Sequence, residues 1–245
     1  MRRYMTVIIL FLAATTATAS AAIAAPRSTL GVETDIALPK SITSIVFTDS
    51  HGSKHRLDDL PGVTLLVPFL TLCNDVCPFT TGNAIQVARM LESRHDSNVH
   101  VIEITVDPRR DTVRRLAAYR RMVGLGNTDS TISLWRATGN RTATFMKFFG
   151  ITADHVKSGK NGAIDWMTHR RIRYEVDHSD GFYVLDSRHH IRYISGLSAR
   201  FVGTLTRSLT NYLSSEGRHT LMHPHAGWTP RDAVASMAYV AKRPL

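Results

Sequence analysis

The sequence predicts an α/β fold built on a mixed sheet, and three observations support this prediction. An apolar run at residues 63–70 and a partly alternating run at 98–107 indicate two buried strands. Each run precedes a segment whose apolar residues recur with helical spacing, at residues 78–94 and 111–124. A late antiparallel hairpin and a further helix occupy residues 182–215. This order of elements is typical of a thioredoxin-like fold.

A β-hairpin is expected ahead of the first core strand. Short strands on either side of His51–Gly52–Ser53 would pair through a turn at these residues. Within the first core strand, Pro68 is unexpected for a central position, because proline has no N–H to donate to a neighbouring strand. The second helix has Asp111 as its expected N-cap and ends at Gly124.

The rest of the chain divides into shorter segments. A strand at residues 131–139 and a helix at 140–150 precede an irregular stretch at 151–172, and a short helix is expected after Thr229. We therefore expect a signal peptide or anchor, a linker, a thioredoxin-like domain that includes the N-terminal β-hairpin, and a C-terminal helical extension, at residues 1–25, 26–40, 41–215 and 216–245.

The start of the chain predicts export. A basic segment, MRRYM, precedes an uncharged stretch at residues 6–25 that ends in small residues before Pro26. That stretch is about long enough to span a bilayer, so an uncleaved membrane anchor is the alternative to a cleaved signal peptide. Its threonines and short apolar core favour cleavage. In either case we expect the protein in the periplasm or on the outer face of the cytoplasmic membrane.

The formal net charge of +10 raises the question of nucleic-acid binding. Export argues against a nucleic-acid partner, and the arginines are scattered along the chain instead of following one face. We expect most of them to be solvated surface residues. Attraction to acidic lipids or to an acidic protein partner is the alternative.

Both cysteines of the chain lie in the segment TLCNDVCPFT, as Cys73 and Cys77. They could form a structural disulfide, a redox pair or part of a metal site. A disulfide across so short a loop would constrain little unfolded-chain entropy, which disfavours the structural role. At the start of the predicted helix, backbone amides and the helix dipole should lower the pKa of both thiols. The C-x-x-x-C spacing allows the sulfurs either to close a disulfide or to separate around an ion.

Two thiolates suit Cu(I), and also Zn(II), although zinc prefers four ligands. Most of the 12 histidines are expected on the surface. His178 differs because it precedes the late hairpin, in a loop that approaches the cysteine loop in a thioredoxin-like fold. We expect His178 to supply a third ligand beside Cys73 and Cys77. Binding needs deprotonated thiols and a neutral imidazole, so the affinity should fall in acid.

The chain contains three stretches in a recognisable order: LCNDVCPFT, VDPRRDT and YEVDHSDGFYVLD. In order and spacing they resemble the signature motifs of the Sco (SenC/PrrC-type) copper-chaperone family, and the resemblance covers about residues 40–215. It implies an exported, commonly membrane-tethered protein that binds copper through Cys73, Cys77 and His178. It also implies assembly of the dinuclear copper centre of cytochrome c oxidase, as copper donor or thiol reductant. The partner would be the copper-site subunit of the oxidase or another cuproprotein.

Further residues can support such a site. Asp107 and Asp177 lie in the motif stretches, where they would orient the ligand loops or serve as ordinary turn carboxylates. Met167 and the pair His223/His225 offer transient copper contacts, although methionine more often fills gaps in a core.

The main alternative is a thiol–disulfide oxidoreductase, in which one thiolate attacks a partner disulfide and the other cysteine resolves it. Such an enzyme needs no histidine at position 178, so His178 favours copper, with Cu(I) expected and Cu(II) as the alternative state. Leu70 and Leu72 depart from the aromatic-rich approach to the first cysteine that the family usually has. Residues 151–172 and the tail also match the family poorly. These departures concern the choice of partner more than metal binding.

Overall fold

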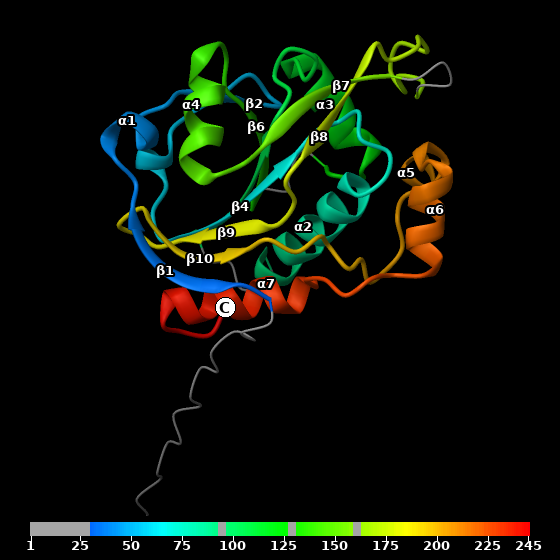
Figure 1. Cartoon of the computed structure of the whole chain (residues 1–245). Coiled ribbons are helices and arrows are strands. Elements are labelled where there is room, and N and C mark those ends of the chain that lie inside the picture. Colours follow the sequence, from blue (N-terminus) through cyan, green and yellow to red (C-terminus); the bar gives the residue numbers. More distant parts are fainter. Residues whose placement is uncertain (1–29, 93–96, 127–130, 159–162) are drawn as a thin grey trace, which may run out of the picture.

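The computed structural model describes residues 30–92, 97–126, 131–158 and 163–245. An eight-stranded mixed sheet has the order β1-β10-β9-β4-β5-β6-β2-β3, and a smaller sheet pairs β7 with β8 (Figure 1). The strands are β1 Val32–Ala37, β2 Phe47–Asp49, β3 Lys54–His55, β4 Val63–Phe69, β5 Val99–Thr105, β6 Ile132–Arg136, β7 Ala153–Lys157, β8 Tyr174–His178, β9 Phe182–Leu185 and β10 His190–Ser195. The helices are α1 Lys40–Thr43, α2 Cys77–Glu92, α3 Val113–Met122, α4 Asn140–Phe149, α5 Arg207–Tyr212, α6 Ser215–Met222 and α7 Pro230–Ala241, with a 3-10 turn at Leu57–Asp59.

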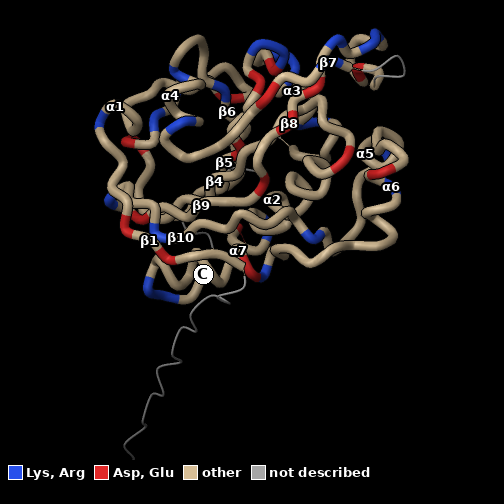
Figure 2. The backbone as a smooth tube through the Cα atoms, viewed as in Figure 1, with Lys and Arg blue, Asp and Glu red and all other residues tan. Residues whose placement is uncertain are grey.

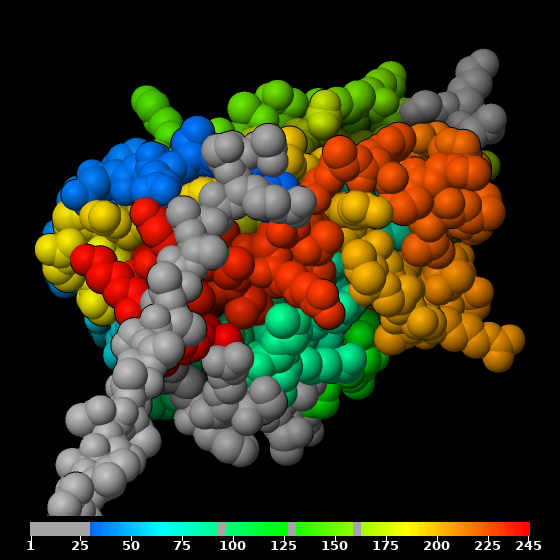
Figure 3. Space-filling model, turned by 90° about the horizontal axis from the view of Figure 1, so that it is seen from below, coloured from blue at the N-terminus to red at the C-terminus, as the bar shows by residue number. Residues whose placement is uncertain are grey.

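Helices cover both faces of the large sheet (Figure 1). Because side chains alternate along a strand, Leu65 and Val67 of β4 face α2, α3 and α7, whereas Leu66 faces α4. Helix α7 lies beside α2 on the first face (Figure 3). On the second face, aromatic rings stack between the sheet and α4; they belong to Phe47, Trp135, Phe145 and Phe149. Burial on both faces explains why β4 is apolar at nearly every position.

Pro68 is tolerated in this central strand because of where the strand pairing ends. Strand β9 pairs with β4 through Thr64 to Leu66, so its ladder stops two residues before Pro68. On the other side, Pro68 lies opposite Ile104 of the parallel strand β5. The missing N–H therefore removes no hydrogen bond to β9.

The predicted central elements are confirmed. The expected strands at residues 63–70, 98–107 and 131–139 correspond to β4, β5 and β6, and each is followed by its expected helix. The N-terminal β-hairpin is formed by β2 and β3. Its turn passes through Gly52, whose φ of 88° is a conformation that glycine adopts without strain.

Several predictions at the periphery are corrected. The stretch at residues 151–172 is not wholly irregular, because β7 within it pairs with β8. Part of the segment expected as a linker forms the edge strand β1. Helix α3 is capped by Thr112, whose hydroxyl accepts the amide of Arg115, and not by Asp111.

The helix expected at residues 197–215 is also corrected, since this segment contains only the short helix Arg207–Tyr212 and the first residue of α6. Tertiary contacts hold the first part in an irregular, non-helical conformation. Phe201 packs so closely on α2 that a Cβ on Gly82 would lie 2.5 Å from its ring. The carbonyl of Arg200 accepts a hydrogen bond from the Asn83 side chain at 3.2 Å, which a helical conformation of this segment would lose.

The expected signal peptide or anchor lies outside the described residues. Within the described part of the chain, none of the helices combines the length and the apolar character that crossing a bilayer requires. Lysine and arginine residues are spread over elements on different sides of the molecule (Figure 2).

Candidate metal centre

The cysteine loop connects β4 to α2, and α2 begins at Cys77 itself. Cys73 is half-buried, Cys77 is buried, and both are free thiols. The backbone amide of Cys77 donates to the Cys73 Sγ atom at 3.3 Å. The amides at a helix N-terminus have no partner within the helix, so here they are available to stabilise a thiolate on Cys73.

His178 reaches Cys77 from the end of β8. Its Nε2 atom lies 3.3 Å from the Cys77 Sγ atom. Its Nδ1 atom lies 3.0 Å from the carbonyl oxygen of Ser179. Because a carbonyl oxygen can only accept, Nδ1 carries the proton in the neutral imidazole. The Nε2 lone pair therefore points at the sulfur, which is the tautomer that a metal ligand at this position needs.

The two thiols have opposite acidities. The pKa of Cys73 is lowered by a hydrogen bond from the Cys77 side chain and by backbone amides of the loop, among them that of Val76. The pKa of Cys77 is raised well above its ordinary value, because burial disfavours its thiolate and a negative Cys73 lies beside it. The sequence predicted a lowered pKa for both cysteines. Cys73 is therefore the more acidic thiol of the pair, and Cys77 is the side chain that donates to it.

Cys73, Cys77 and His178 come together as a row instead of a closed set of ligands. Cys77 contacts both of the others. Among the residues that the structure describes, no group of three or more His, Cys, Asp or Glu side chains is arranged to hold a metal ion. A three-ligand site would require the Cys73 sulfur or the end of β8 to move toward the third partner.

Asp107 acts on this site from a distance. Its buried carboxylate pairs with the Arg110 guanidinium and accepts the Tyr174 hydroxyl at 3.3 Å. Arg110 in turn donates to the Tyr174 carbonyl at 2.5 Å and lies 3.8 Å from the centre of its ring. Tyr174 begins β8, the strand that ends at His178. Asp107 therefore positions the strand of the expected ligand without touching a ligand itself.

The other expected supporting residues lie elsewhere. Asp177 is exposed, and alternation along β8 places it on the opposite face from His178. Met167 lies in a turn, where its amide donates to Asp165. His225 lines a pocket on another side of the cysteine loop. Asp180, which sequence reasoning did not select, raises the pKa of Cys77 through its negative charge.

Sequence reasoning also missed the anchor of the cysteine loop. Asp111 accepts both the amide and the hydroxyl of Thr71, at 3.1 and 2.5 Å. It also accepts the Thr105 hydroxyl at 2.5 Å, and the carbonyl of Thr71 accepts the Trp166 indole N–H at 2.8 Å. The signal was present, because Asp111 belongs to the VDPRRDT stretch, but the sequence pattern indicated a helix cap.

Cys73 opens onto a cleft of about 380 Å³. The cysteine loop forms one wall, β8 a second, and the start of α6 a third. Charged side chains at its rim belong to Asp75, Arg110, Glu175 and Glu216. A partner protein can therefore reach the Cys73 sulfur through this cleft, whereas Cys77 stays behind it.

The SCO1/SenC family profile matches residues 39–204, more than half of the chain. A mitochondrial Protein SCO2 homolog of Mus musculus is 36% identical over 99 residues, which is 38% of this chain and 38% of the mouse protein. The chain thus matches well under two thirds of that relative's length.

Solved structures share the fold. Bradyrhizobium japonicum ScoI with copper bound superimposes with a TM-score of 0.51 at 20% identity, covering 84% of this chain and 99% of that one. A SCO1/SenC family lipoprotein from Bacillus anthracis gives a TM-score of 0.51 at 20% identity, covering 77% and 97%. These likenesses confirm the predicted thioredoxin-like fold, and the family profile adds the family: the chain is a member of the SCO1/SenC family.

Proposed function

We propose that this protein is a copper chaperone that binds Cu(I) through Cys73, Cys77 and His178 and passes it to the copper-site subunit of cytochrome c oxidase. The ion is cargo, to be bound and released. We further propose that the protein works outside the cytoplasm, as residues 1–25 would export or anchor it, with residues 41–215 as the copper-binding domain.

One observation carries the proposal. Cys77 and His178 are 101 residues apart in sequence, yet the imidazole lone pair points at the Cys77 sulfur from 3.3 Å. Cys73 also contacts the Cys77 side chain and is the more acidic thiol. Thiolate and imidazole are ligands that suit Cu(I). The copper-bound B. japonicum ScoI, a protein of the same fold, agrees with this choice of metal.

The arrangement of Cys73, Cys77 and His178, which is not a closed set of ligands, suits an ion that is bound and then passed on. Binding would require Cys77 to lose its proton, and its raised pKa makes that loss costly in the absence of metal. A partner thiolate that enters the cleft at Cys73 can replace the ligands one at a time. As the metal leaves, Cys77 regains its proton, which favours release of the ion.

Titration of the reduced full chain with Cu(I), against a chromophoric chelator, tests the proposal. We expect one copper per chain, and we expect His178→Ala and Cys77→Ser each to weaken binding by more than about 100-fold, since even groups that only orient ligands contribute 10–100-fold. His51→Ala removes an exposed histidine of the β2–β3 turn and serves as the matched control. Wild-type affinity in His178→Ala would refute the three-ligand site.

The opposite acidities of the two thiols favour a second candidate function, reduction of a partner disulfide. The Cys73 thiolate would attack one partner sulfur and expel the other as a thiolate. Cys77, after losing its proton, would then attack the Cys73 sulfur of the mixed disulfide. The partner would leave as a dithiol, with Cys73 and Cys77 oxidised to a disulfide. Turnover with a dithiol reductant that is unchanged in His178→Ala would favour this function over copper binding.

A further inference from the structure

Helix α6 lies beyond residue 204, where the match to the family profile ends. It begins against the cysteine loop: the Ser214 amide donates to the Asn74 carbonyl at 2.9 Å, and the Ser214 hydroxyl donates to the Asp75 carboxylate. Gly217 lies so close to this loop that a Cβ there would be 2.7 Å from the Asn74 oxygen. The helix is therefore fixed directly on the loop that carries Cys73 and Cys77.

The C-terminal end of this helix carries potential metal ligands. His219 and Met222 belong to α6 and are three residues apart, so their side chains lie on neighbouring parts of its surface, and His223 follows as the C-cap residue. The two imidazole ring centres are 4.8 Å apart. An imidazole nitrogen lies about 2 Å from a metal that it binds. Rings at this separation can therefore share a single ion.

The exposure of Met222 points to a role other than packing. Its side chain is 69% exposed, whereas methionine ordinarily fills gaps in a core. Both histidines are exposed as well. A thioether is a soft ligand that selects Cu(I), and imidazole binds copper in either oxidation state. An exposed thioether and two exposed imidazoles at the same end of a helix are thus a donor set that suits copper.

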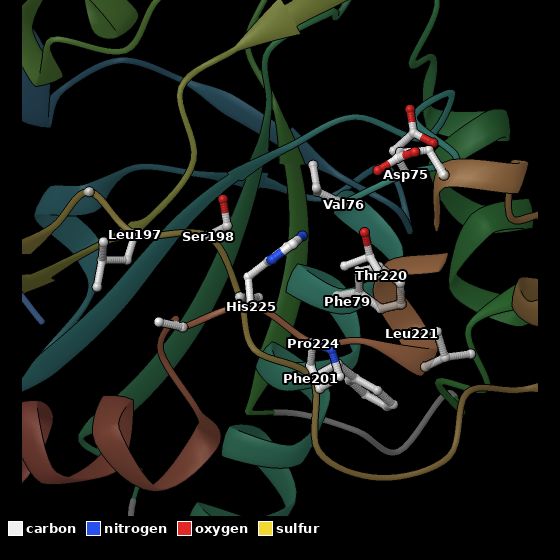
Figure 4. Close-up of a pocket in the computed structure, with 14 residues that line it drawn as sticks. Asp75, Val76, Phe79, Leu197, Ser198, Phe201, Thr220, Leu221, Pro224 and His225 are labelled. Atoms are coloured by element: carbon white, nitrogen blue, oxygen red, sulfur yellow. The ribbon is translucent and has the colours of Figure 1, made fainter. Parts of the chain in front are cut away.

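A pocket of about 410 Å³ lies between this helix and the cysteine loop. Glu216, Thr220 and Leu221 of α6 line one side of the pocket, and Asp75 and Val76 of the loop line another (Figure 4). His225, just after the helix, points its imidazole into this space (Figure 4). The pocket between α6 and the cysteine loop therefore already contains the imidazole of His225.

We propose that His219, Met222 and His223 form a second copper site, which captures the ion next to the cysteine loop. The two nitrogens and the thioether would hold Cu(I), and the histidine pair alone would hold Cu(II). Six residues separate Gly217, at the loop, from His223, which corresponds to about 9 Å along a helix. The site stands on its own donors, and only its role as a loading station rests on the proposed function.

The test uses the full chain with Cys73→Ser and Cys77→Ser, so that the proposed cysteine site cannot contribute. We expect this chain to bind one Cu(I) in competition with a chromophoric chelator, and one Cu(II) with a nitrogen-rich spectrum in electron paramagnetic resonance. His219→Ala with His223→Ala should weaken the binding of Cu(I) and of Cu(II) by at least about tenfold, which is the usual loss of affinity when a metal site loses a supporting group. Met222→Leu should weaken Cu(I) binding and leave Cu(II) binding unchanged.

The matched control in the same background is His51→Ala with His169→Asn, which removes two exposed histidines from separate loops. If it weakens binding as much as the α6 pair does, copper is held by scattered surface histidines and the site is refuted. The absence of any copper binding by the cysteine-free chain would also refute it. Neither result bears on the site at Cys73 and Cys77, which the His178→Ala titration tests separately.

Discussion

Two buried carboxylic acids lie on the α2 side of β5, one in the middle of the strand and one beyond its end. Glu103 and Asp111 are 0% and 1% exposed, so burial opposes the ionisation of both. Asp111 accepts three hydrogen bonds, from the amide and hydroxyl of Thr71 and from the hydroxyl of Thr105. Glu103 accepts one, from Thr81 at 2.8 Å, and its Oε2 atom has no partner within the described residues.

The difference in donors separates the two acids at neutral pH. Burial raises the pKa of Glu103 to about 8, whereas the added donors limit the rise at Asp111 to about 6. Asp111 is therefore ionised at pH 7 and holds the cysteine loop through charge-assisted hydrogen bonds, while Glu103 is mostly protonated. In mid-strand the backbone donors are used by the neighbouring strands, but at the strand ends they are free to bind a carboxylate. The strand ends are also where Cys73, Cys77 and His178 lie.

Of the differences expected between Glu103 and Asp111, the largest should appear in how the free energy of unfolding changes with pH. The pKa of Glu103 is higher in the folded state, about 8, than its ordinary 4.5, so the folded state holds its proton more tightly. Stability is then fully present below pH 4.5 and falls as the pH rises to 8, by about 5 kcal/mol from this one group. Glu103→Gln should remove this contribution to the change of unfolding free energy with pH. Urea unfolding of the reduced protein between pH 4.5 and pH 8 measures it.

Asp154→Asn serves as the control, because it removes a carboxylate that is exposed on β7. We expect its slope to match that of the wild type. If Glu103→Gln and the wild type lose stability equally between pH 5 and pH 8, Glu103 is ionised at little cost and the two acids do not differ as described.

The anchor at Asp111 should show the next largest effect. Thr71→Val keeps the size of the side chain but removes the hydroxyl that donates to the carboxylate at 2.5 Å. Hydrogen bonds to a charged group contribute about 1.5–3 kcal/mol, so we expect a loss of about 2 kcal/mol at pH 7 in urea unfolding. The pKa of Asp111 should rise further above 6, measured by NMR titration of its carboxyl carbon.

Thr144→Val is a suitable comparison, since the Thr144 hydroxyl donates to the carbonyl of Asn140 on an exposed turn of α4. A loss in Thr71→Val no larger than in this variant would show that the ionised Asp111 does not hold the cysteine loop.

The strands around these acids could be predicted because their signal is local. Strand β4 is buried at every position, so its apolar run alone identifies it. Strands β1 and β7 were missed because nearly all of their residues are exposed, which leaves no apolar alternation in the sequence. Helix α6 was missed for a similar reason: of its eight residues only Gly217 is buried. Sequence patterns reveal elements that bury side chains, and these three elements bury few.

The candidate site was predictable where motif and fold coincide. Cys73, Cys77 and His178 followed from the order of elements together with three short stretches of sequence. The anchoring role of Asp111 was not predictable, because its partner Thr71 lies 40 residues away and neither residue indicates the other. The acidity of Cys77 was mispredicted because helix position suggests a thiolate, while burial and a neighbouring negative charge prevail.

The smallest effect should be a change with pH at Thr81, the donor to Glu103. At pH 6 Glu103 is protonated, so Thr81→Val removes two hydrogen bonds between neutral groups, the one to Glu103 and the one that Thr81 accepts from the Tyr119 hydroxyl at 3.3 Å, each worth about 1 kcal/mol. Above pH 8 the carboxylate is ionised and loses the donor that lies 2.8 Å away, so the cost should rise by about 1 kcal/mol. Thr71→Val should cost nearly the same at pH 7 and pH 9, because Asp111 is ionised at both. Parallel urea series on the two variants measure this contrast. A cost of Thr81→Val that does not change with pH would mean that Glu103 keeps one charge state throughout, and the distinction between the two acids would then rest on Asp111 alone.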